Sequence, residues 1–308
     1  MKLISNHPLW AQLASICVAI IATLMPVAAF AQSKDVVATV DGVKITAGDI
    51  DTYCKIMKID APSADTRNTI RETLIDRMLL EKFLKEKKAV PDQAVLDQQM
   101  GAFVSVADHT KQPLEELLAK RGLTTAELER FLSVDLKWLN FAQKTITPQQ
   151  VKIYFEQNKN RFDGTRVTAR QIFWKLPQPM SDEALQKKLL AATAVRDQIN
   201  KGEITFEDAA KTISESPSGK INGGLMEDVA YFGAMPTVIT QIAFATREGE
   251  LSQPFVTPFG IHVLKVEKIK VGTFSLDDAY PLVFERMSQT LRENTVLQLR
   301  KDAMIERK

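Results

Sequence analysis

Cysteine and histidine are scarce in this sequence, which holds two and three of them among 308 residues. Cys17 lies in an N-terminal apolar run, so a chain processed after that run keeps only Cys54 and cannot form an internal disulfide. Cys54 lies in a stretch with helical spacing, and no local motif pairs it with a base. We therefore interpret it as a small buried apolar residue. No spacing of His, Cys, Asp and Glu indicates a metal site, and we expect no metal and no cofactor.

An excess of charge of either sign is also missing. The 40 basic and 38 acidic residues leave a net charge of +2, and no basic run exceeds a few residues. This pattern argues against a nucleic-acid-binding protein and is typical of a solvated surface. The hydrophobic content of 45% is ordinary for a globular protein, and the length allows two modest domains and a signal segment.

Charge is nearly absent from the N-terminus, where Lys2 is the only charged residue before Lys34. An apolar run from about Leu9 to Met25 is followed by Pro26 and by Ala29-Phe30-Ala31. A charged start, an apolar middle and a small-x-small exit are typical of a secretory signal peptide, which we assign to 1–31. The alternative is an uncleaved anchor, because the run approaches the roughly 20 residues that span a bilayer. We expect secretion across the cytoplasmic membrane, with no stable membrane insertion after cleavage; in a Gram-negative source the location is the periplasm.

The segment 32–164 has a hairpin signal followed by helical patterns. Asp41-Gly42 lies between two alternating β-branched runs, and Thr46 is suited to cap a helix from Ala47. Apolar residues at spacings of three and four then predict helices over Thr66–Lys88, from Pro91 to about 106, over Leu114–Lys120, from about 125 to 144 and from Pro148 to about 161. These apolar stripes indicate either packing between helices or a groove for apolar segments of unfolded clients.

The segment resembles the N-terminal domain of extracytoplasmic foldases of the SurA and PrsA type. The resemblance rests on the hairpin that leads into several helices and on the stretch Tyr154–Phe162. It implies a helical chaperone domain over 32–164. The segment 271–308 predicts one long helix with Ser275 as its cap, and the resemblance implies that this helix packs on the N-terminal helices.

The segment 165–270 carries blocks that resemble parvulin-type peptidyl-prolyl isomerases. Besides a strand pattern over Val167–Lys175, these blocks are Ser214-Glu215-Ser216-Pro217, Gly223-Gly224, Tyr231-Phe232-Gly233, Glu248–Phe255 and Phe259–Val266. The resemblance implies a four-stranded antiparallel sheet with about four helices. The expected fold class is therefore α+β, with this parvulin domain inserted into a mostly helical lobe built from both ends of the chain.

The expected reaction breaks no bond. Rotation about a peptide bond is opposed by a resonance barrier of about 18–20 kcal/mol, and X–Pro bonds exchange over tens to hundreds of seconds. A catalyst must bind the twisted amide better than the planar one. An apolar slot for the proline ring, a dry surround and hydrogen-bond donors to the amide all serve that purpose.

Two histidines and a cysteine or aspartate lie near the amide in parvulins. The resemblance puts His262 at the second histidine, Gln171 at the first and Ser216 at the cysteine or aspartate position. We expect these three residues to be catalytic. Gln171 can still hydrogen-bond His262, and Ser216 keeps a hydroxyl donor but loses a charge or thiol. The substitutions predict weak activity.

A methionine and a phenylalanine line the proline slot in the family. The resemblance puts Met235 at the methionine and Ile239 at the phenylalanine, and we add Phe259 as a substrate-binding residue. Ile239 keeps the slot apolar but narrows it.

The first hypothesis is an extracytoplasmic foldase that isomerises X–Pro bonds in unfolded secreted or envelope proteins. The alternative is a chaperone or assembly factor whose degenerate parvulin domain only binds peptides. A third reading is a scaffold or adaptor for an export or polysaccharide apparatus. The expected partners are unfolded polypeptides that contain X–Pro, and nucleic acid is not among them.

Overall fold

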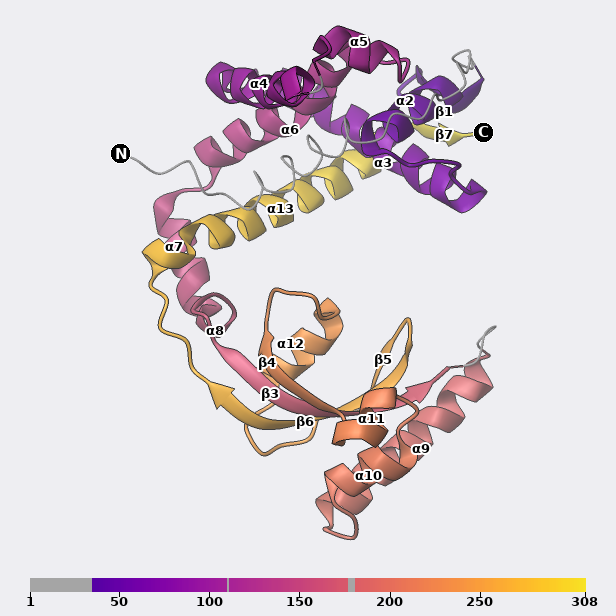
Figure 1. The fold of residues 1–308 in the computed structure, drawn as a ribbon, viewed down its shortest axis with the longest axis vertical. Coiled ribbons are helices and arrows are strands. Elements are labelled where there is room, and N and C mark those ends of the chain that lie inside the picture. Colours follow the sequence, from indigo (N-terminus) through magenta and orange to yellow (C-terminus); the bar gives the residue numbers. More distant parts are fainter. Residues whose placement is uncertain (1–34, 110, 177–180) are drawn as a thin grey trace. The chain divides into compact units, whose positions relative to one another are not determined.

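The computed structural model describes residues 35–109, 111–176 and 181–308 (Figure 1). The predicted signal peptide lies outside these residues. The described chain forms two compact units, one of residues up to Val151 together with Pro281–Lys308, and one of Lys152–Tyr280. We call them the helical unit and the sheet unit. None of the helices in the described ranges is long and apolar enough to cross a membrane.

The helical unit begins with the predicted hairpin. Its elements are β1 (Val36–Val40), β2 (Val43–Thr46), α2 (Ala47–Met57), α3 (Ala64–Glu86), α4 (Gln93–His109), α5 (Leu114–Ala119), α6 (Thr125–Thr145), most of α13 (Leu276–Asp302) and β7 (Ile305–Arg307). Thr46 caps α2 as predicted, because its side chain accepts from the Asp49 amide while the Asp49 carboxylate accepts from the Thr46 amide. Thr124 and Glu127 form the same reciprocal cap at α6.

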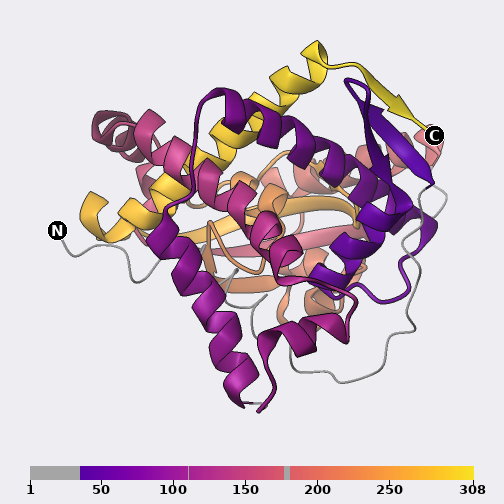
Figure 2. The same cartoon turned by 90° about the horizontal axis from the view of Figure 1, so that it is seen from above.

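The C-terminal segment differs from the continuous helix that the sequence predicts. Helix α13 ends at Asp302, and β7 then pairs antiparallel with β1, so that the small sheet has the order β2-β1-β7. Figure 1 and Figure 2 both show β7 beside the hairpin. At the hairpin turn, Asp41 N donates to Met304 O and Met304 N donates to the Asp41 carboxylate, each at 2.9 Å. Because the backbone groups of the last residues find partners in β1, a strand replaces the expected last helical turns.

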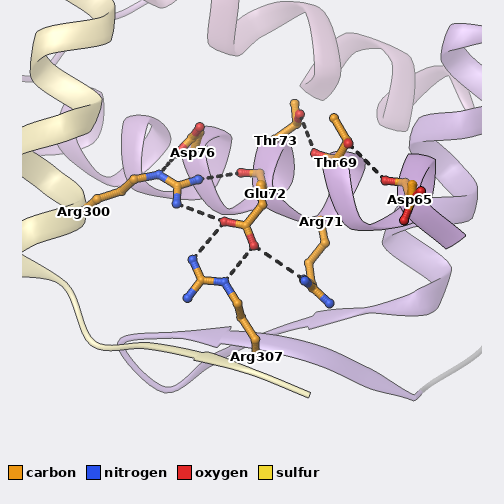
Figure 3. A network of polar contacts seen from close by, with 8 residues as sticks. All are labelled: Asp65, Thr69, Arg71, Glu72, Thr73, Asp76, Arg300 and Arg307. Atoms are coloured by element: carbon orange, nitrogen blue, oxygen red, sulfur yellow. Dashed lines mark hydrogen bonds and ion pairs between the residues drawn. The ribbon is translucent and has the colours of Figure 1, made fainter. Parts of the chain in front are cut away.

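Glu72 on α3 is the centre of the ion network that holds this segment (Figure 3). Its carboxylate accepts from Arg300 Nη1 at 3.0 Å and from Arg307 Nε at 2.7 Å, and Arg300 also binds Asp76. The hydrogen bond from Arg307 has the largest effect on the pKa of Glu72. Together with the hydrogen bond from Arg300, it lowers this pKa from 4.5 to about 2. Arg307 therefore binds α3 from the strand β7.

Helix α13 also packs on α6. Trp138 Nε1 donates to Ser288 Oγ at 3.0 Å, and Arg292 Nη1 binds Asp135 at 2.8 Å. The pKa of Asp135 is lowered by its two arginine neighbours, Arg77 and Arg292, against the opposing effect of burial. The predicted fold class is confirmed in this respect, since helices from both ends of the chain form one lobe.

Among its described residues, the sheet unit has four strands, all antiparallel, in the order β4-β3-β6-β5. They are β3 (Arg166–Lys175), β4 (Leu225–Ala230), β5 (Phe255–Thr257) and β6 (Gly260–Lys270). The helices are α8 (Lys159–Phe162), α9 (Asp182–Asn200), α10 (Phe206–Ile213), α11 (Pro217–Asn222) and α12 (Thr237–Ala245). Helix α7 (Pro148–Gln157) starts in the helical unit and ends in the sheet unit.

The prediction of a single helix from Pro148 to about 161 is wrong. The helix is interrupted at Asn158, which separates α7 from α8. Asn158 has φ −126° and ψ 26°, and its side-chain Nδ2 donates to the Tyr154 carbonyl at 2.9 Å. A side-chain amide that bonds the preceding turn competes with helix continuation, which explains the break.

The sheet is buried on both faces. One face packs on α9 and α10 through a cluster that includes Ile172, Trp174, Ile261 and Val263. The other face packs on α12 through Val167, Ala169, Ile239, Ala243, Leu264 and Val266. The candidate site lies on this second face.

Candidate functional site

His262 lies on the face of the sheet that α12 covers. Successive side chains of a strand point to opposite faces, and Leu264 and Val266 pack with α12 while Ile261 and Val263 pack on the other side. His262 therefore shares the face of Leu264. Its partners in the register are Phe173 on β3 and Phe255 on β5, so the central position of β6 brings three strands together at the imidazole.

The imidazole is enclosed by two polar and two aromatic side chains. Nδ1 lies 3.3 Å from Gln171 Oε1, and Nε2 lies 2.9 Å from Thr257 Oγ1. The ring stacks on Phe255 at 5.3 Å between centroids, and the Phe173 ring is tilted against it at 4.9 Å. His262 is 4% exposed, whereas Gln171, Phe173 and Phe255 are half-buried. The site is thus a buried imidazole under a partly exposed aromatic surface.

The protonation of His262 follows from these contacts. The Gln171 oxygen can only accept, so Nδ1 carries the proton, and Nε2 accepts from the Thr257 hydroxyl. Burial lowers the pKa of His262 from its usual 6.5 to about 4. The imidazole is therefore neutral at neutral pH, in one tautomer, with both nitrogens satisfied.

Gln171 is held by the backbone of the Gly223-Gly224 turn. Gln171 N donates to Gly224 O at 2.9 Å, and Gly224 has φ +72°. A Cβ atom at Gly224 would lie 2.1 Å from the Gln171 carbonyl oxygen. Arg170 fixes the same turn, since its Nη1 donates to Asn222 O at 2.6 Å and its Nε to Glu267 at 2.7 Å. The turn needs glycine because the two backbones approach too closely for a side chain.

The residues expected at the proline slot lie in different environments. Met235 is half-buried and packs against the α12 cluster, to which Phe255 also belongs. Ile239 is 4% exposed and lies within that cluster. Phe259 is 64% exposed at the turn between β5 and β6, where its amide donates to Thr257 Oγ1 at 3.2 Å. Phe255 therefore links this cluster to His262, on which its ring stacks, and Met235 is a half-buried member of the same cluster.

Ser216 precedes α11 and contacts a neighbouring serine. Its Oγ lies 2.7 Å from Ser218 Oγ. The segment is docked on β3, since Glu215 N donates to Phe173 O at 2.8 Å and Phe173 N donates to Ser214 Oγ at 3.1 Å. Ser216 is thus anchored beside the strand that faces His262, while the contact described for its hydroxyl is with Ser218.

The sequence interpretation missed Thr257, Phe173 and Phe255. Phe173 lies two residues after Gln171 on a predicted strand, which is a signal for the same face. Phe255 and Thr257 alternate in the same way before Pro258, at a position that turns toward Phe259 and the last strand. Both signals were present, but assigning them to His262 requires the register between strands.

This arrangement is poorly suited to covalent chemistry. The hydroxyl next to His262 belongs to Thr257, which is 5% exposed and already accepts from a backbone amide. The other imidazole nitrogen faces an amide, whereas a triad orients its base with a carboxylate. Within the described residues no cluster of His, Cys, Asp and Glu is arranged to hold a metal. A neutral, apolar surface with amide and imidazole groups is suited to binding a polypeptide without cleaving it.

Comparisons with known proteins show what the chain is similar to. Residues 172–268 match the family model described as the PPIC-type PPIASE domain, which confirms the parvulin resemblance. The chain is 26% identical over 270 residues to the foldase protein PrsA of Clostridium botulinum strain 657, covering 78% of this chain and 76% of that protein. It is 25% identical over 260 residues to PrsA of Caldanaerobacter subterraneus, covering 79% and 77%. A solved structure of PrsA from Bacillus cereus has 18% identity and a TM-score of 0.48, covering 88% of this chain and 93% of that one.

Proposed function

We propose that this chain, which carries a PPIC-type parvulin domain, is an extracytoplasmic foldase that isomerises X–Pro bonds in unfolded polypeptides. The carrying observation is the neutral, buried His262–Gln171 pair beneath the half-buried rings of Phe173 and Phe255, within the segment that matches the family. The curated relatives are named foldases, which supports the same activity here.

The proposed mechanism is differential binding of the twisted amide. The planar amide is the charge-separated form, and an apolar surround of Phe255, Met235 and Phe173 disfavours it relative to the twisted form. His262 holds the Gln171 oxygen, so the Gln171 amide nitrogen presents its two hydrogens to the substrate. Each factor of ten in rate requires about 1.4 kcal/mol of such preference.

In this proposal, the remaining expected site residues support the surface that binds the substrate amide or lie at its edge. Ile239 supports the apolar surface from within the α12 cluster, and Phe259 extends it at the turn that follows β5. Ser216 supplies a hydroxyl donor beside β3, released from Ser218 when a substrate carbonyl is present. The Ser216 hydroxyl interacts more weakly with the amide than a thiolate or carboxylate at that position would, so we expect modest activity.

The rest of the chain has a chaperone and delivery role in the same proposal. We propose a signal peptide at 1–31, a client-binding helical domain over 32–164 and an isomerase domain over 165–270, with 271–308 completing the helical lobe. The N-terminal sequence and the foldase names of the relatives support an extracytoplasmic location, and in a Gram-negative source the periplasm.

A protease-coupled peptide assay tests the isomerase activity. The chain expressed from residue 32 should accelerate cis–trans exchange of an Xaa-Pro peptide, and His262→Ala and Gln171→Ala should each lower kcat/KM. Lys268→Ala is the control, because Lys268 is exposed on β6 away from the imidazole contacts. No acceleration by a chain with native circular dichroism would refute the isomerase function.

A non-catalytic peptide-binding chaperone is the second candidate. It is favoured by Gln171 in place of a family histidine and by Ile239, which is 4% exposed where an accessible aromatic ring is expected. In that case the same peptides bind, with a measurable heat in calorimetry, but their exchange is not accelerated. Suppression of aggregation by the full chain, compared with the sheet unit Lys152–Tyr280, tests the contribution of the helical domain.

A further inference from the structure

A continuous series of aromatic rings runs through the sheet unit from its N-terminal helices to α12. The Tyr154 ring lies 5.7 Å from that of Phe162, and Phe162 lies 5.1 Å from Phe232. Phe232 is 4.8 Å from Tyr231, and Tyr231 is 5.2 Å from Phe244. We call these five residues the aromatic series. All of them belong to the sheet unit.

The two ends of the series have different relations to the site. Tyr154 on α7 and Phe162 on α8 precede the segment 172–268 that matches the family. Phe244 is on α12 and packs in the same cluster as Met235 and Ile239. The series therefore connects residues outside the matched segment to the apolar part of the candidate site.

The geometry of the contacts indicates that they hold the chain in place. Edge-to-face and tilted ring pairs contribute beyond simple burial, and the Tyr231 ring is nearly perpendicular to both Phe232 and Phe244. Arg161 adds a guanidinium 4.9 Å from the centre of the Tyr231 ring. Tyr231 and Phe232 come directly before the Gly233-Ala234-Met235 loop, which has no regular structure and depends on such contacts for its position.

A second set of contacts anchors the N-terminal end of the series. Thr165 Oγ1 accepts from Gly272 N at 3.0 Å, and Phe274 N donates to Asp163 O at 2.8 Å. The Phe274 ring lies against Gly164, where an added Cβ would meet it at 3.1 Å. Phe162 precedes this junction and is 3% exposed. It is therefore a fixed element against which Phe232 packs.

We propose that Tyr154, Arg161 and Phe162 are positioning residues for the proline slot, although they lie outside the matched isomerase segment. They fix the Tyr231–Met235 loop and, through Phe244, the helix that carries Ile239. The inference rests on the proposed function for its kinetic consequence, but the positioning itself is independent of turnover. It implies that the functional isomerase unit begins near Lys152, as the compact unit does.

The test uses the chain from residue 32 with Phe162→Ala and the control Phe206→Ala. Both phenylalanines are 3% exposed in the sheet unit, but Phe206 packs with α9 and α10 on the face of the sheet opposite the Met235 cluster. Phe162→Ala should shift the Met235 methyl resonance in a spectrum of ¹³C-methyl methionine. It should raise KM roughly fivefold and change kcat less, because the slot is disturbed while the imidazole is not. Phe162→Tyr should keep both the Met235 methyl resonance and KM close to those of the unaltered chain.

Phe206→Ala should lower the melting temperature and leave the Met235 resonance in place. If Phe162→Ala unfolds the chain, Tyr154→Leu, at a half-buried position, provides the same readouts. An unmoved Met235 resonance in a folded variant, or an equal shift in the Phe206 control, would overturn the positioning role. If the unaltered chain shows no isomerase activity, the proposed function fails, and the methyl shift alone still tests the positioning.

Discussion

His262 should make the sheet unit sensitive to mild acid. Burial lowers its pKa from 6.5 to about 4 in the folded protein, whereas the unfolded chain keeps the ordinary value. As the pH falls through 6.5, the unfolded state therefore binds a proton before the folded state does. The stability contribution is complete above pH 6.5 and is lost progressively toward pH 4.

The magnitude follows from the difference between the two pKa values. Each unit of difference corresponds to about 1.4 kcal/mol, and between about pH 7.5 and pH 5 the unfolding free energy should fall by about 2 kcal/mol. Carboxylates contribute at lower pH. Glu72, in the helical unit, keeps its contribution above 4.5 and loses it as the pH falls toward 2. The His262 contribution is lost mainly at higher pH than the Glu72 contribution, so the pH dependence distinguishes the stability of the sheet unit from that of the helical unit.

Urea unfolding at several pH values measures this effect. In a chain from residue 32 the tryptophans are Trp138 in the helical unit and Trp174 in the sheet unit, so Trp138→Phe leaves a reporter for the sheet unit alone. His262→Gln in that background should remove the slope between pH 7.5 and 5. Leu190→Ala, at a position that is 70% exposed on α9 of the sheet unit, is the control and should leave the slope unchanged. An identical slope with and without His262 would refute the assignment of a buried neutral imidazole.

Two further predictions concern the glycine turn and the ion network. Gly224→Ala should destabilise the sheet unit at least roughly twice as much as Gly202→Ala, for which about 1 kcal/mol is expected. Both glycines have positive φ, but only at Gly224 would a Cβ meet a backbone oxygen, that of Gln171; equal melting temperatures would contradict this. Glu72→Gln should cost the helical unit about 1–2 kcal/mol by leaving Arg300 with weaker partners. Trp138 fluorescence checks it, and an equal loss in the Trp174 transition would contradict a local effect.

The elements with strong local signals could be predicted from the sequence. Asp41-Gly42 indicates a hairpin by turn chemistry alone, and Thr46 indicates the start of α2 because a hydroxyl followed three residues later by a carboxylate satisfies the free amides. The short strand β7 has no such signal. It forms because β1 has an edge that can pair with it, and because Arg307 binds Glu72, which precedes it by 235 residues in the sequence.

The candidate site could be predicted only in part. The parvulin resemblance identified His262 and Gln171, and these do lie within hydrogen-bonding distance. Thr257 as the second partner of the imidazole depends on the register between β5 and β6, which a sequence does not specify without its turn geometry. The burial of Ile239 depends on how α12 rotates over the sheet, a tertiary property that no local pattern encodes.

Exchange NMR on an Xaa-Pro peptide tests the central claim most directly, because it observes both isomers without a protease. The uncatalysed exchange takes tens to hundreds of seconds. With a small fraction of the chain present, cross-peaks between the cis and trans proline resonances should appear within a mixing time of about one second, and His262→Ala should weaken them. A peptide that binds the folded chain and still shows no exchange cross-peaks would contradict the account.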